Sequence, residues 1–318
     1  MKNLQKKMKK YMKPVGNAIS ALSILFVLSV FVRTDFQFSF VSDWKGFLIA
    51  CLLGVGIKTA TVFLSANAWA EWLSFFAEKK CSRREALRVY AKANIGKYMP
   101  GNVMHYIERN LFAKKLAVSQ KKVAASSACE VATLVLTAFL LGVLFAYPAI
   151  REAFSESAAI KNALFFAPIA FGILFFVAAL FCFFNRKKCA RAVKAHLKVG
   201  ISKRFVRTLL CCMALYAAVL TGLGFIFVEL YVYQGGEPSF MQSVSMIASY
   251  MAAWAVGFVV PGAPGGIGVR ELALFALLKN TMGEHTVVTL GVWHRLITVI
   301  GDMAAYVVAA GMRKSAYK

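Results

Sequence analysis

The chain has 318 residues, of which 59% are hydrophobic, and its mean hydropathy is +0.64. Soluble domains contain roughly 45–50% apolar residues, so this composition excludes a water-soluble globular protein. Lys and Arg number 38 against 14 Asp and Glu, giving a net charge of +24, although only 16% of the residues are charged. The positive charge must therefore gather in a few clusters between long apolar stretches.

The apolar stretches are long enough to cross a lipid bilayer. A helix that rises ~1.5 Å per residue needs about 20 residues to span a hydrocarbon core of ~30 Å. We predict membrane crossings over residues 18–32, 47–76, 123–147, 163–184, 209–233 and 287–311. The first follows a basic N-terminal segment and precedes no small-residue cleavage site, so we expect a retained signal anchor.

Two further apolar stretches, residues 90–112 and 244–278, are interrupted by Pro and Gly and carry charged residues. Lys97 and Arg109 would make a full crossing costly for the first stretch. Basic clusters flank that stretch at both ends, so we predict a re-entrant hairpin that enters and leaves on one side. The second stretch is expected to do the same from the opposite side.

The distribution of Lys and Arg orients these segments. Of the basic residues, 27 lie in clusters at residues 2–13, 79–88, 114–122, 186–207 and 313–318. Because basic loops stay on the cytoplasmic side, we predict six crossings with both termini cytoplasmic. A model with eight crossings, in which each broken stretch forms two short spanning helices, gives the same loop sides and stays open.

The two broken stretches resemble each other at an offset of 161 residues. Both read G-x3-P-G-x7-R, and the paired residues are Gly96 and Gly257, Pro100 and Pro261, Gly101 and Gly262, Arg109 and Arg270. Three crossings per half give the halves opposite orientations, as in the inverted repeats of many transporters. The predicted fold is therefore an all-α polytopic membrane protein, one domain over 1–318, with half-repeats 1–150 and 162–311.

The Pro-Gly pairs predict a break in each helix, since Pro removes an amide hydrogen and Gly accepts backbone angles closed to other residues. Free amides at the end of a half-helix, together with Arg109 or Arg270, favour an anion such as phosphate. The alternative is that the breaks are structural kinks and each Arg pairs with a carboxylate. The two interpretations are compatible, because an empty site must also be neutralised.

Among the ionisable residues within predicted crossings, four are further candidates for the site: Lys58, Glu130, Arg295 and Asp302. Arg295 and Asp302 are seven residues apart, so they share a helix face and could contribute to one site. Lys58 could bind an anionic headgroup or neutralise a Glu, and Glu130 or Asp302 could relay protons. The four His and seven Cys show no metal-ligand spacing, so no cofactor is expected.

The segments NIGKYMPGNVMHYIERNLFAKKLAVS (94–119) and VPGAPGGIGVRELALFALL (260–278) resemble the transmembrane domain of lysylphosphatidylglycerol synthases and their stand-alone relatives. That family has a P-G-x7-R segment in the middle and a P-x3-G-G-x-G-x-R-E segment near the end. The resemblance implies a bacterial or archaeal plasma-membrane protein that moves a lipid between leaflets. By motif position it implies a translocation site at Pro100, Gly101, Arg109, Pro261, Gly265, Gly266, Gly268, Arg270 and Glu271.

In the synthases, a soluble aminoacyltransferase domain that uses charged tRNA follows the membrane domain. This sequence ends at Lys318, so we expect no synthesis of lysylphosphatidylglycerol and no binding of nucleic acid. The expected partners are membrane lipids with anionic headgroups, and possible further partners are enzymes of lipid or polysaccharide synthesis.

The sequence thus predicts a flippase or transporter for an anionic-headgroup phospholipid, polyprenyl phosphate or glycolipid. Arg109 would engage the headgroup from the cytoplasmic side and Arg270 from the outer side. Two alternatives stay open. A lipid-modifying enzyme could use His105, Glu108 and Arg109 on one half-helix, and a scaffold for a synthesis complex would not transport.

Overall fold

The computed structural model describes residues 44–98, 104–116, 118–153, 202–259, 266 and 268–312. These residues form eight α-helices and two short 3₁₀ helices, η2 and η3, and no strand is found among them. The helices are α2 (Trp44–Ala77), α3 (Arg83–Asn94), η2 (Ile95–Tyr98), α4 (Met104–Phe112), η3 (Ala113–Leu116), α5 (Gln120–Ala153), α8 (Lys203–Tyr233), α9 (Phe240–Val259), α10 (Val269–Met282) and α11 (Glu284–Gly311).

Four helices are long and apolar enough to cross a membrane: α2, α5, α8 and α11. They confirm the predicted crossings at 47–76, 123–147, 209–233 and 287–311. The other two predicted crossings, 18–32 and 163–184, lie outside the described residues. On α2 the exposed side chains include Leu48, Ile49 and Leu52, and a helix that is apolar all round belongs in a large core or in lipid. The chain is therefore a polytopic, all-helical membrane protein.

Both broken stretches form two helices rather than one. η2 ends at Tyr98 and α4 begins at Met104, while α9 ends at Val259 and α10 begins at Val269. α3 has 12 residues and α4 has 9, which is about 18 Å and 14 Å of helix. Neither is long enough to cross the bilayer alone.

The order of the helices repeats along the chain. A long helix, two shorter helices and a second long helix appear as α2, α3, α4, α5 and again as α8, α9, α10, α11. The packing repeats as well: α2 contacts α8, α5 contacts α9 as α11 contacts α3, and α2 contacts α11 as α8 contacts α5. The order of the described helices and their packing thus repeat between the first and second halves of the chain.

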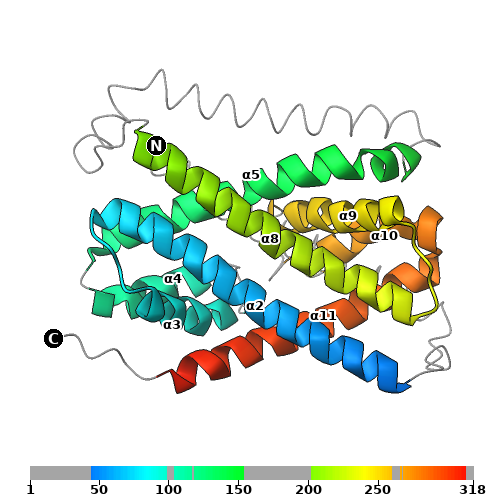
Figure 1. The fold of residues 1–318 in the computed structure, drawn as a ribbon, viewed down its shortest axis with the longest axis horizontal. Helices are drawn as coiled ribbons and strands as arrows, with labels where there is room; N and C mark the ends of the chain where they lie inside the picture. The colour runs from blue at the N-terminus through cyan, green and yellow to red at the C-terminus, as the bar shows by residue number, and fades with distance from the viewer. Residues whose placement is uncertain are drawn as a thin grey trace, which may run out of the picture.

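The two halves run in opposite directions (Figure 1). α2 and α8 are antiparallel, the α3–α4 hairpin lies at the left end of the molecule, and the α9–α10 hairpin lies at the right end. α2 ends and α8 begins at the same end of the bundle (Figure 1). Next to these helix ends in the sequence lie the basic residues Lys79, Lys80, Arg83 and Arg84, which follow α2, and Lys203, Arg204 and Arg207, which lie in the first turns of α8. The basic clusters that the structure describes next to α2 and α8 therefore lie at one end of the folded molecule.

Close packing between the halves depends on small residues. A methyl group placed on Gly142 of α5 would lie 2.8 Å from the backbone nitrogen of Ala252 in α9. Small residues let membrane helices approach closely, and the resulting contact stabilises their association.

We predict that Gly142→Ala lowers the thermal unfolding midpoint of the detergent-solubilised protein, because overpacking against a backbone costs about 1–3 kcal/mol. Gly56→Ala is the matched control, since a methyl group there would meet nothing within 4 Å. Equal midpoints for both variants would contradict the α5–α9 contact.

Candidate functional site

A cavity of about 160 Å³ lies inside the helical bundle, and each of the eight α-helices contributes to its lining. The predicted site residues that line it are Lys58, Arg109, Glu130, Gly266, Arg270, Arg295 and Asp302. Residues from both halves, separated by up to 244 positions in sequence, therefore come together around one space. The predicted residues Pro100, Gly101, Pro261 and Gly265 lie outside the described residues.

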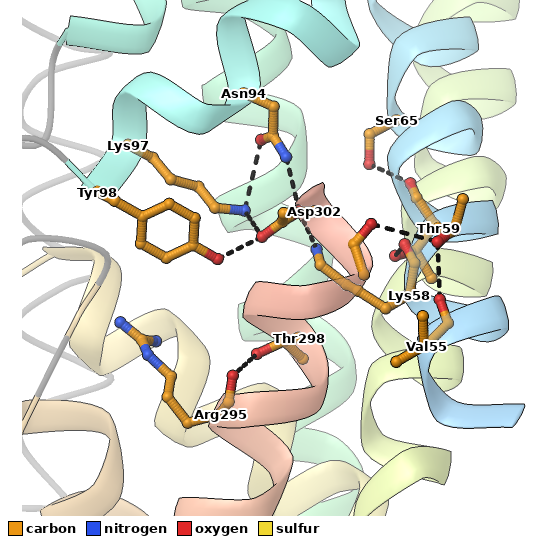
Figure 2. A network of polar contacts seen from close by, with 12 residues as sticks. Val55, Lys58, Thr59, Ser65, Asn94, Lys97, Tyr98, Arg295, Thr298 and Asp302 are labelled. Carbon is orange, nitrogen blue, oxygen red and sulfur yellow. Dashed lines mark hydrogen bonds and ion pairs between the residues drawn. The ribbon is translucent and has the colours of Figure 1, made fainter. Parts of the chain in front are cut away.

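Asp302 of α11 is the centre of one polar network (Figure 2), and its side chain is fully buried. Lys58 Nζ of α2 lies 3.1 Å from Oδ1, and Lys97 Nζ of η2 lies 2.6 Å from Oδ2. Asn94 donates from Nδ2 to Oδ1 at 2.7 Å, and the hydroxyl of Tyr98 donates to Oδ2 at 2.5 Å. One carboxylate thus ties α11 to α2 and to the end of the first half-helix.

Two roles were left open for Lys58, and its ion-pair partner in the structure is Asp302 rather than a Glu. Gly301 makes this possible: a methyl group on Gly301 would lie 2.5 Å from Cγ of Lys58. The aliphatic part of Lys58 thus lies directly against the backbone of α11, and its ammonium reaches the next residue.

Arg109 is the centre of a second network, built almost wholly within the first half. Its guanidinium forms an ion pair with Glu130 of α5, and both side chains are buried. The hydroxyl of Tyr90 donates to the other oxygen of Glu130 at 2.9 Å. The guanidinium also lies over the rings of Tyr90, Trp69 and Tyr106, at 4.0, 5.2 and 5.4 Å from their centroids. This is the carboxylate pairing that the sequence left open for Arg109.

Arg270 has looser contacts. Its Nη1 donates to the hydroxyl of Tyr250 at 3.2 Å, and its Nη2 lies 3.5 Å from Oε1 of Glu271. The other oxygen of Glu271 accepts from the backbone amide of Gly268 at 2.7 Å. Gly268 has φ of +84° at the start of α10, in the left-handed region that glycine adopts most readily. The loop conformation therefore positions the carboxylate of Glu271 beside Arg270.

The repeated glycines have the same role in both halves. A methyl group on Gly96 would lie 2.6 Å from Oε2 of Glu108 in α4, and one on Gly257 would lie 3.0 Å from Cβ of Arg270 in α10. In each half the glycine lets the second half-helix pack closely on the first. The motif residues Gly96 and Gly257 therefore bring the two arms of each hairpin together.

Sequence reasoning missed several lining residues: Tyr90, Asn94, Lys97, Tyr98 and Tyr250. For Tyr90 and Asn94 the available signal was the amphipathic pattern of α3, a pattern that α4 shares. Of the residues suggested for an enzyme, His105 and Arg109 line the cavity, whereas Glu108 lies against Gly96.

These features define the chain as a polytopic helical membrane protein with a buried polar cavity between two hairpins. The family model described as the lysylphosphatidylglycerol synthase TM region matches residues 13–305, so the chain belongs to that family. Membership places the protein among membrane proteins with lipid-related functions. No curated protein matches the chain, and no solved structure matches it.

We predict that Asp302→Asn destabilises the fold, because it leaves the ammonium groups of Lys58 and Lys97 without their carboxylate. Breaking a buried ion pair by removing one partner costs about 3–5 kcal/mol, which should appear as a lower thermal unfolding midpoint in detergent.

Glu71→Gln is the control for this prediction. Its pair with Arg83 has side chains 31% and 68% exposed, and exposed pairs contribute only about 0–1 kcal/mol. The contribution assigned to Asp302 would be refuted by equal midpoints for the two variants.

Proposed function

We propose that this protein moves a lipid with an anionic headgroup between the leaflets of the plasma membrane. The observation that carries the proposal is the charge of the cavity. Among the described residues its lining includes five cationic side chains, Lys58, Lys97, Arg109, Arg270 and Arg295, and two carboxylates, Glu130 and Asp302. Buried charges need partners, and an anionic headgroup would supply the missing negative charge.

The position of the cavity also supports transport. A headgroup that crosses the bilayer unaided leaves water for hydrocarbon, which is costly for a charged group. A polar cavity inside the bundle replaces the lost water with fixed donors, while the acyl or prenyl chains stay in the lipid. Hydrogen-bond donors on several helices can thus contact the headgroup in turn as it moves through the bundle.

The opposed hairpins suggest how the site could open to either side. In many transporters, inverted repeats with broken helices place the substrate site near mid-membrane, and the two halves rock around it. Here the α3–α4 and α9–α10 hairpins reach the cavity from opposite ends of the bundle. We propose that both are re-entrant and that they gate the cavity alternately. The basic end would face the cytoplasm, together with both termini.

We expect Arg270→Ala to slow leaflet exchange of a fluorescent anionic lipid in liposomes by at least about tenfold, the equivalent of one lost charge-assisted contact of ~1.4 kcal/mol. The readout is the fraction of label protected from an external quencher over time. Arg207→Ala is the matched control, because Arg207 is exposed at the basic end of α8.

The other outcomes would contradict the proposal in different ways. If wild type exchanges the lipid and both variants exchange it equally fast, Arg270 is excluded from the transport site. If purified wild type exchanges no anionic or polyprenyl lipid, transport is refuted in favour of a scaffold that should co-purify with a synthesis enzyme. A lipid recovered in chemically altered form would instead indicate a lipid-modifying enzyme.

A further inference from the structure

Two buried side chains of the second half, Tyr250 and His294, form a series of contacts that ends at Arg270. On the premise that Arg270 binds the anionic headgroup as proposed above, we infer that both are positioning residues for lipid transport. Tyr250 holds the guanidinium at the cavity, and His294 holds the ring of Tyr250. The comparison of the two repeated motifs selected neither residue.

Arg270 has few contacts that fix its position. The polar contacts that the structure describes for its guanidinium are a hydrogen bond from Nη1 to the Tyr250 hydroxyl, at 3.2 Å, and the approach of Nη2 to Glu271, at 3.5 Å. A separation of 3.5 Å is long for a hydrogen bond, so the phenol is the closer partner. An arginine side chain has many rotamers and loses conformational entropy when one of them is selected. The Tyr250 hydroxyl therefore selects the rotamer with which Arg270 lines the cavity.

The hydroxyl of Tyr250, rather than the face of its ring, makes this contact. The Cζ atom of Arg270 lies 5.6 Å from the ring centroid, near the ~6 Å limit of a cation–π contact. The Arg109 guanidinium, by contrast, lies 4.0 Å from the centroid of the Tyr90 ring. Removal of the single oxygen atom of the Tyr250 side chain should thus release Arg270 and leave the packing of the ring unchanged.

His294 of α11 holds the Tyr250 ring in place. The centroids of the two rings are 4.7 Å apart, and both residues are fully enclosed, with Tyr250 0% and His294 1% exposed. Nε2 of His294 lies 3.0 Å from the backbone carbonyl oxygen of Leu223 in α8. A carbonyl oxygen only accepts, so Nε2 carries a hydrogen and donates it. This hydrogen bond fixes the orientation of the imidazole, and the imidazole limits the positions open to Tyr250.

The series of contacts joins the four long and short helices of the second half. Its members are Leu223 in α8, His294 in α11, Tyr250 in α9 and Arg270 in α10. The position of Arg270 therefore depends on how the helices of its own half pack together.

The first half has no equivalent series among its described residues. At the offset of 161, Tyr250 and His294 correspond to Val89 and Thr133. A valine side chain has no polar atom, so it cannot accept a hydrogen bond from an arginine. Arg109 instead has a carboxylate and three aromatic rings around its guanidinium. Tyr250 and His294 thus perform for Arg270 a task that other residues perform in the first half.

The test measures how far Tyr250 acts through Arg270. Leaflet exchange is followed in phosphatidylcholine liposomes for wild type, Tyr250→Phe, Arg270→Ala and the double variant. The label is whichever of fluorescent phosphatidylglycerol, phosphatidic acid and polyprenyl phosphate wild type exchanges fastest. We expect Tyr250→Phe to slow exchange about three- to tenfold, because a hydrogen bond to a charged group is lost. In the Arg270→Ala background the same substitution should have no further effect, since the contact that it removes is already absent.

Two further variants complete the design. Tyr306→Phe is the matched control, because Tyr306 lies on α11, is 42% exposed and is not among the residues that line the cavity. It should exchange lipid at the wild-type rate. His294→Gln retains an N–H donor for the Leu223 carbonyl but removes the ring beside Tyr250. It should slow exchange in the wild-type background and have no further effect in the Arg270→Ala background.

A binding measurement distinguishes positioning from a purely structural role. A ligand that binds the folded state raises its thermal unfolding midpoint, so the concentration of a short-chain lipid that gives half of this rise reports its affinity. With the headgroup that wild type exchanges, Tyr250→Phe should raise that concentration about three- to tenfold and leave the lipid-free midpoint unchanged. A lower lipid-free midpoint, with slow exchange that persists without Arg270, would instead show that Tyr250 acts on the fold.

The outcomes separate this inference from the proposed function. If wild type exchanges no lipid of the panel, transport itself is refuted, and the inference is refuted with it. If Arg270→Ala slows exchange and Tyr250→Phe does not, the positioning role is wrong and transport stands. Equal slowing by Tyr250→Phe with and without Arg270 would also overturn the inference, because Tyr250 would then act independently of the guanidinium. The same result for His294→Gln would remove His294 from the series.

Discussion

The structure depends on keeping charged side chains neutral inside a bundle whose outer surface is apolar. Asp302 of α11 is the main neutralising group, since its two carboxylate oxygens accept from Lys58, Asn94, Lys97 and Tyr98. Each of these groups would be costly to bury alone. The positions of α2, α3 and α11 are thus coupled through one carboxylate, and the polar cavity exists because those helices are held around it.

The two halves neutralise their buried arginines, Arg109 and Arg270, with carboxylates from different positions. The repeat position of Glu130 is Gly291, and that of Asp302 is Leu141, so the long helices do not carry equivalent carboxylates. A methyl group on Gly291 would lie 3.9 Å from Cγ of Glu271, so Glu271 of α10 reaches the region that a carboxylate on α11 would occupy. The carboxylate near Arg270 comes from its own helix, which leaves this arginine more loosely held than Arg109.

Hydropathy, charge and the repeated motif were sufficient to predict the four long helices, the two helix breaks and several residues of the cavity. These features depend on local composition, and the burial of Lys58, Glu130 and Asp302 followed from the cost of charge in a membrane. The pairing pattern could not be predicted, because Lys58 meets Asp302 across 244 positions and Tyr90 meets Glu130 across a hairpin. Such contacts depend on how the helices cross, which periodicity does not determine.

All eight α-helices that the structure describes, from both halves of the chain, contribute to the lining of the cavity. Neither half of the described chain could therefore enclose this space alone. A substitution on any one of these helices can alter the same polar space, so the two halves cannot change independently at the residues that line it.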